Sequence, residues 1–102
     1  MSLVTEKKTL LTIVTESVVE PTLLRELERM GVKGYTVSDA RGMGSRGARD
    51  AAWQELANIR IEIICARAKA EEVLEHLQTR YFKDYAMVSF IQEVEVLRAA
   101  KF

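Results

Sequence analysis

The sequence predicts an α+β fold in which two helices cover one face of an antiparallel sheet. Short runs of β-branched and aliphatic residues indicate strands, and two longer segments carry apolar residues at helical spacing. These elements follow one another in the order strand, helix, strand, strand, helix, strand. A chain of 102 residues fits one domain with a core of its own, and subunit association would add to its modest stability. We therefore expect a single domain over residues 1–102.

The first strand and helix are predicted within residues 8–31. Residues 8–15 are short and rich in β-branched side chains, which favours a strand. Pro21 suits the first helical turn, and Gly31 stands where a helix C-terminal cap belongs. One face of this helix is expected to carry Leu23, Leu24, Leu27 and Met30. Residues 35–38 predict the second strand.

The second half of the chain predicts two further strands, a helix and a short fifth strand. Residues 57–66 alternate, with Ile59, Ile61, Ile63 and Cys65 on one side. The second helix is expected over residues 68–81, with an apolar face of Ala70, Val73, Leu74, Leu77 and Tyr81. Residues 85–91 predict the fourth strand and residues 93–97 the fifth. Without the fifth strand this is the split βαβ order of ferredoxin-like folds, βαββαβ.

The face of the sheet away from the helices is expected to be partly apolar. Leu10, Val14 and Ile64 alternate out of phase with the apolar set that faces the helices. An apolar sheet face without helices favours burial against other subunits.

Composition excludes several classes of function. Lys+Arg and Asp+Glu number 15 each, so no overall charge points to nucleic acid or a membrane surface. No apolar run is long enough for a signal peptide or a membrane span, and we expect a cytoplasmic protein. Cys65 has no partner cysteine and is interpreted as a buried, inert thiol.

A loop of glycines and arginines after the second strand is the main candidate site. Gly42, Gly44 and Gly47 allow the main chain to turn several N–H groups toward one anion. Arg41, Arg46 and Arg49 add positive charge and fork-shaped donors. This is the chemistry of phosphate binding. The alternative is a tight connecting loop whose arginines face water.

Two nucleotide motifs are rejected. Residues 42–47 match Gly-x-Gly-x-x-Gly, and Glu62 lies about twenty residues on. The dinucleotide fold requires an amphipathic helix directly after the motif, whereas residues 48–56 have no apolar face and Glu62 falls within a strand. The P-loop ending Gly-Lys-Ser/Thr is absent.

No catalytic constellation is predicted. His76 lies on the polar helix face beside Glu72 and Arg80, which is typical of a solvated surface residue. Trp53 lies in the segment without periodicity, where it either anchors a protein partner or folds back onto the core.

The motif Lys-Gly-Tyr-Thr-Val at residues 33–37, followed by Arg-Gly-Met-Gly at 41–44, resembles the PII signalling family. Residues 61–64 are similar to the PII strand that follows the long T-loop, here at about residues 42–56. The resemblance implies a homotrimer with adenine nucleotides bound between subunits.

Departures from the nitrogen-regulatory PII pattern narrow the resemblance. The ATP-gripping Gly-Asp-Gly-Lys is replaced by residues 81–86, and residues 46–56 contain no tyrosine for uridylylation. Residues 42–46 and 81–86 resemble instead the PII-like regulators of bicarbonate uptake and the carboxysome-associated PII proteins, which bind AMP, ADP or cyclic AMP. The cysteine pair found at the end of many transporter-linked members is absent, which favours the carboxysome-associated group.

The resemblance implies a set of binding residues. The nucleotide is expected to contact Thr36, Arg41, Gly42, Met43, Gly44, Ser45, Arg46, Glu62, Ile63, Tyr85, Ala86, Met87 and Arg98. Arg49 and Trp53 are expected to contact a protein partner, a bicarbonate transporter or a carboxysome component, so that the protein could be peripheral to the inner membrane. Bicarbonate is a further expected ligand, and no metal or catalytic cofactor is expected. The alternatives are a nitrogen-regulatory PII protein that senses ATP, ADP and 2-oxoglutarate, a nucleotide-hydrolysing enzyme, and a metal-tolerance trimer of the same fold.

Overall fold

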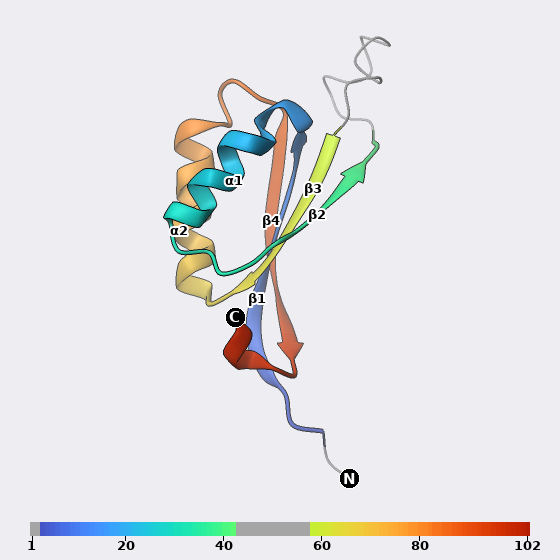
Figure 1. Cartoon of the computed structure of the whole chain (residues 1–102), viewed down its shortest axis with the longest axis vertical. Coiled ribbons are helices and arrows are strands. Elements are labelled where there is room, and N and C mark those ends of the chain that lie inside the picture. Colours follow the sequence, from blue (N-terminus) through green and yellow to red (C-terminus); the bar gives the residue numbers. More distant parts are fainter. Residues whose placement is uncertain (1–2, 43–57) are drawn as a thin grey trace.

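The computed structural model describes residues 3–42 and 58–102, and in them a four-stranded antiparallel sheet carries both helices on one face (Figure 1). The sheet order is β2-β3-β1-β4. The strands are β1 (Glu6–Glu16), β2 (Thr36–Ala40), β3 (Asn58–Cys65) and β4 (Met87–Val96). The helices are α1 (Glu20–Arg29) and α2 (Arg67–Arg80), with short 3-10 turns η1 (Ser17–Val19) and η4 (Ala99–Lys101). The predicted ferredoxin-like order is confirmed.

The predicted division of the last strand is wrong. Strand β4 pairs with β1 without interruption, from Met87 opposite Thr15 to Val96 opposite Glu6. The predicted division fell at Gln92, whose side chain is exposed. Because β4 is an edge strand, polar side chains can reach water there without breaking the ladder.

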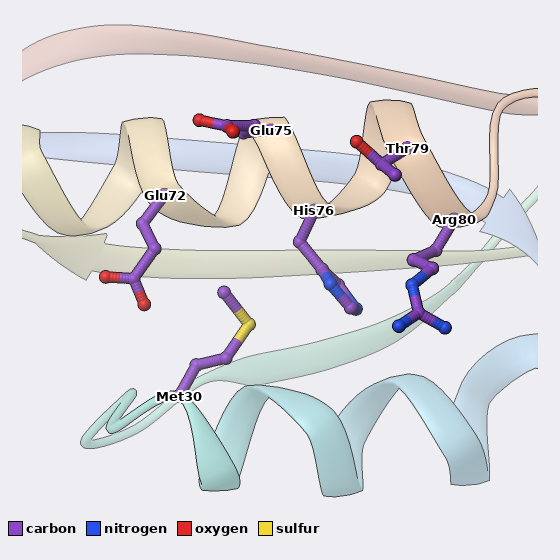
Figure 2. A pocket seen from close by; sticks show the side chains of 6 residues that line it. All are labelled: Met30, Glu72, Glu75, His76, Thr79 and Arg80. Carbon is purple, nitrogen blue, oxygen red and sulfur yellow. The ribbon is translucent and has the colours of Figure 1, made fainter.

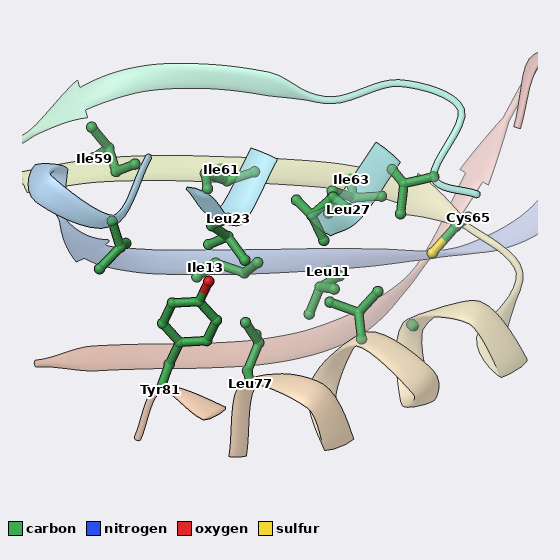
Figure 3. Close-up of a cluster of buried hydrophobic side chains, with 14 residues drawn as sticks. Leu11, Ile13, Leu23, Leu27, Ile59, Ile61, Ile63, Cys65, Leu77 and Tyr81 are labelled. Atoms are coloured by element: carbon green, nitrogen blue, oxygen red, sulfur yellow. The ribbon is translucent and has the colours of Figure 1, made fainter. Parts of the chain in front are cut away.

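The core lies between the sheet and the two helices. Alternate residues of β1 and β3 point into it and meet the apolar faces of α1 and α2 (Figure 3). Fully buried members include Leu11, Ile13, Leu23, Leu27, Ile61, Val73 and Leu77. The period of two in residues 57–66 and the helical spacings therefore predicted the core correctly. Cys65 is buried at its edge, and burial raises the pKa of the thiol.

Helix α1 ends in the glycine-capped turn that the sequence predicted. Gly31 has φ of +88°, its N–H donates to the carbonyl of Glu28, and the N–H of Val32 donates to that of Leu27. This pair of bonds is the Schellman motif. The ammonium of Lys69, on α2, donates to the carbonyl of Met30, so the second helix ties down the end of the first.

The uncovered face of the sheet is partly apolar, as expected. Leu10, Val14 and Ile64 lie on it and are half-buried. The register adds two exposed members from β4, because Val88 pairs with Val14 and Phe90 pairs with Thr12. Val88 is 60% exposed and Phe90 is 40% exposed. The apolar surface on this face is therefore larger than the sequence alone indicated.

Candidate functional site

Thr36 and Glu62 lie side by side on the uncovered face, where β2 pairs with β3. The Nε atom of Arg60 lies 3.4 Å from Oε2 of Glu62, and both side chains are about 40% exposed. Ser38 is the cross-strand partner of Arg60. Thr36 and Glu62, both predicted to contact a ligand, are therefore neighbours on a surface that offers a hydroxyl and a carboxylate.

Ile63 alternates with Glu62 and points the other way. Its side chain is 1% exposed and belongs to the core under the helices. A ligand on the uncovered face therefore cannot reach this side chain. Only the main chain of Ile63 could line a binding cleft.

Arg41 and Gly42 extend beyond the end of β2 and are exposed. Ala40 pairs with Asn58, so the chain leaves the sheet and returns to it at adjacent points. A Cβ atom on Gly42 would meet nothing within 4 Å, which leaves room for a ligand close to the main chain. Six other predicted contacts lie outside the described residues: Met43, Gly44, Ser45, Arg46, Arg49 and Trp53.

The connection between α2 and β4 is fastened to the end of β1. The hydroxyl of Thr15 donates to the carbonyl of Ala86 over 2.9 Å. The N–H of Ala86 donates to Oε2 of Glu16 over 2.7 Å. Tyr85 and Met87, on either side, pack partly against the core. Residues 85–87 are thus held at the same end of the sheet as Ala40 and Asn58.

The described candidate residues of one chain do not form a single pocket. Strands β2 and β4 are separated by β3 and β1, and three strand spacings amount to about 14 Å. Arg98 lies two residues after Val96, the last residue of β4, and Val96 pairs with Glu6 at the opposite end of the sheet. Figure 1 shows this end of β4 far from the end where β2 leaves the sheet. Thr36, Ala86 and Arg98 therefore mark three separate places on one subunit.

A polar cluster between the helices was missed from the sequence. Nε2 of His76 on α2 lies 2.7 Å from Oε1 of Glu26 on α1, and the hydroxyl of Tyr81 donates to the same oxygen over 2.6 Å. The side chains of His76 and Glu26 are only 23% and 25% exposed. The prediction that His76 is a solvated surface residue is therefore wrong. The signal was Glu26 itself, which falls between Leu23 and Leu27 on the apolar stripe of α1.

The contacts in this cluster shift the pKa values of Glu26 and Tyr81. Burial raises the pKa of Glu26, but the hydrogen bonds from His76 and Tyr81, with the positive charge of Arg80, outweigh burial and leave it below its ordinary value. Burial, and then the bond to Glu26, raises the pKa of the Tyr81 hydroxyl. An ionised carboxylate only accepts hydrogen bonds, so Nε2 of His76 carries the hydrogen in this contact.

The groove beside this cluster has a volume of about 330 Å³ (Figure 2). Its lining includes Met30, Glu72, Glu75, His76, Thr79 and Arg80. Carboxylates and cations are mixed in the lining, so it presents no field of one sign. In residues 3–42 and 58–102, no three His, Cys, Asp or Glu side chains are grouped to hold a metal ion.

Comparisons with known proteins agree on one family. The family model described as nitrogen regulatory protein P-II matches residues 8–101. A solved structure of a PII-like signalling protein from Thermus thermophilus is 42% identical, covers 96% of this chain and 97% of its own, and has a TM-score of 0.81.

A second relative has been solved with ligands. CPII from Thiomonas intermedia K12, bound to ADP and bicarbonate, is 27% identical over 99% of both chains, with a TM-score of 0.85. The same protein bound to ADP, AMP and acetate gives 27% identity over 98% of both chains and a TM-score of 0.84. None of the helices in the described part of this chain has the length and apolar character of a membrane span.

Proposed function

Because the chain belongs to the nitrogen regulatory protein P-II family, we propose that it is a PII-like signalling protein that senses adenine nucleotides and bicarbonate. The observation that carries this proposal is the likeness, over nearly the whole chain, to a protein solved with ADP and bicarbonate. AMP and cyclic AMP belong to the same ligand class. The process regulated would be uptake of inorganic carbon or carboxysome function, in the cytoplasm.

We propose that the nucleotide binds between the subunits of a trimer. The uncovered sheet face, with Val88 and Phe90 exposed, offers an apolar surface for association. The separation of Thr36, Ala86 and Arg98 supports a shared site, because one subunit does not bring them together. A neighbouring subunit would supply residues 85–87.

Within this site, the loop at residues 41–46 would hold phosphate. Gly42, Met43 and Gly44 would offer main-chain N–H groups, Ser45 a hydroxyl, and Arg41 and Arg46 guanidinium groups. Thr36, Glu62 and the main chain of Ile63 would line the adenine and ribose side, and Arg98 would add a second phosphate contact.

Signalling would follow from a change in the segment at residues 42–56. Ligand contacts at its base can favour one conformation over another by the free energy of one or two hydrogen bonds. Arg49 and Trp53 would then meet, or fail to meet, a protein partner. The partner would be a bicarbonate transporter, which would bring the protein to the inner membrane, or a carboxysome component.

Isothermal titration calorimetry tests the proposal with AMP, ADP, ATP, cyclic AMP and bicarbonate. We expect AMP or ADP binding that Arg46→Ala weakens by about 1–3 kcal/mol, the range of a charge-assisted contact. Arg25→Ala, on the exposed side of α1, serves as the control and should bind as the parent protein does. ATP binding enhanced by 2-oxoglutarate would indicate a nitrogen regulator instead, and sustained ATP turnover with Mg²⁺ would indicate an enzyme.

A further inference from the structure

The connection at residues 81–86 has almost no free main-chain donors. The N–H groups of Tyr81 and Phe82 donate to the carbonyl of Leu77, and those of Asp84 and Tyr85 donate to the carbonyl of Tyr81. A phosphate bound by main-chain N–H groups needs several that point outward together. This connection therefore does not offer a ready anion cradle.

The remaining bond at Ala86 differs in kind from these four. Its acceptor is not a carbonyl but the carboxylate of Glu16, at 2.7 Å. An ionised acceptor favours a short hydrogen bond, and it places a negative charge beside the N–H of Ala86. An approaching phosphate would have to displace that carboxylate and would be repelled by it.

Two contacts position the main chain at Glu16. It is the last residue of β1 and pairs with Asn58, where the chain returns to the sheet. Thr15, beside it, donates to the carbonyl of the same Ala86. Two consecutive residues of β1 thus bind both main-chain groups of Ala86, which keeps the Glu16 main chain and this connection close together.

We propose that Glu16 is a specificity determinant of the nucleotide site: its carboxylate occupies the N–H of Ala86 and disfavours nucleotides whose outer phosphates reach residues 81–86. The negative charge would lower the affinity for ATP most, the affinity for ADP less and the affinity for AMP least. This inference rests on the proposed nucleotide function and adds to it the residue that selects by phosphate number.

The test compares Glu16→Gln with the parent protein in calorimetric titrations of AMP, ADP and ATP. The glutamine oxygen can still accept from Ala86, so the variant removes the charge and keeps the bond. We expect the ratio of ATP affinity to AMP affinity to rise about three- to tenfold, the size of a partly screened charge effect. Raising the salt from about 50 to about 500 mM should narrow the difference between the two proteins, because salt screens the charge.

Two matched variants isolate the charge. Glu28→Gln removes a carboxylate from the exposed side of α1 and should leave the affinity ratio unchanged. Thr15→Val removes the other bond to Ala86 without a change of charge, and it should shift the affinity for all three nucleotides equally.

The possible results separate the two proposals. AMP or ADP binding with an ATP to AMP ratio in Glu16→Gln within twofold of the parent overturns the role of Glu16 and leaves the proposed function intact. An equal rise in Glu28→Gln or Thr15→Val also overturns that role. Failure of the parent protein and Glu16→Gln to bind any of the three nucleotides overturns the proposed function, and the role of Glu16 with it.

Discussion

Glu26 shows how much one side chain can do at the contact between two helices. Its Oε1 receives hydrogen bonds from His76 and from Tyr81, and the rings of these two residues meet edge to face with centroids 6.0 Å apart. Hydrogen bonds to a charged acceptor each contribute about 1.5–3 kcal/mol. The cluster therefore fixes α1 against α2 in addition to the apolar contacts beneath it.

Acid should weaken this contact. The pKa of Glu26 in the folded protein lies below its usual 4.5, so its ionised form contributes stability above about pH 4.5, and this contribution is lost as the pH falls through the folded-state value. We expect Glu26→Gln to lower the free energy of unfolding by about 1–2 kcal/mol at pH 7. The difference from the parent protein should shrink toward pH 3. Urea unfolding at fixed protein concentration and ionic strength measures both.

The control for this effect is Glu28→Gln, two residues along the same helix and exposed. It should change stability by less than about 0.5 kcal/mol. If the difference in free energy of unfolding between Glu26→Gln and the parent stayed constant from pH 7 to pH 3, the titration described for Glu26 would be contradicted.

At the level of single residues, the sequence predicted burial well and polar contacts poorly. Apolar periodicity located Leu27 and Ile61 because burial of an apolar side chain depends on which face it occupies. His76 was misplaced because its partner, Glu26, lies 50 residues away on the other helix. Only the packing of α1 against α2 brings the two together.

Among the elements, the end of α1 depends on the conformation of one residue. Gly31 has a φ that L side chains rarely adopt. A Cβ atom there would meet the Lys69 ammonium at 3.6 Å, which is ordinary contact. Backbone strain rather than collision therefore determines what a substitution costs.

We expect Gly31→Ala to reduce the free energy of unfolding by about 1–2 kcal/mol, the cost of the left-handed conformation for an L residue. Gly34→Ala is the matched control, because Gly34 has no positive φ and a Cβ there would meet nothing within 4 Å. It should be neutral or slightly stabilising. Thermal unfolding of the two variants measures these changes in stability. Equal losses of stability in both variants would show that the φ of Gly31 is not the cause.

The elements were predictable wherever the pattern was local. Pro21 and Gly31 bracketed α1 because helix ends carry their own side-chain preferences. Strand β4 was divided wrongly at Gln92, because the local pattern does not show that the strand continues there. What continues the strand is its ladder with β1, and that ladder joins residues as far apart as Glu6 and Val96.

For the whole molecule, the uncovered sheet face should decide assembly. Phe90 and Val88 are exposed on one subunit, while Thr12 opposite Phe90 is fully buried. Removing apolar side chains from water contributes about 25 cal/mol per Å². Burial of this face against other subunits would therefore stabilise the protein.

We expect Phe90→Glu to dissociate the proposed trimer, because burying an unpaired charge opposes association. Val18→Glu is the control, since Val18 is 71% exposed in η1. Sedimentation velocity should give a smaller species for Phe90→Glu alone. A monomeric parent protein, or an unchanged species for Phe90→Glu, would contradict the role of this face.

The candidate site was only partly predictable, because some of its contacts depend on tertiary packing and on assembly rather than on local sequence. Pairing of Thr36 with Glu62 follows from the strand order, which the sequence indicated. The bond from Ala86 to Glu16 could not be anticipated, because it depends on how the connection after α2 returns to the end of β1. Contacts between neighbouring subunits depend on how the subunits assemble, so no single segment of the sequence predicts them.

The central position of β1 also bears on how the protein is made. Among the described strands it comes first in the chain, yet its partners β3 and β4 are synthesised later, β4 after β3. Pairings over such long sequence separations form slowly, because chain entropy is lost before the contacts are gained. The middle of the sheet is therefore completed only once β4 has been synthesised, and a chain that stops before Met87 leaves the inner strand β1 with one side unpaired.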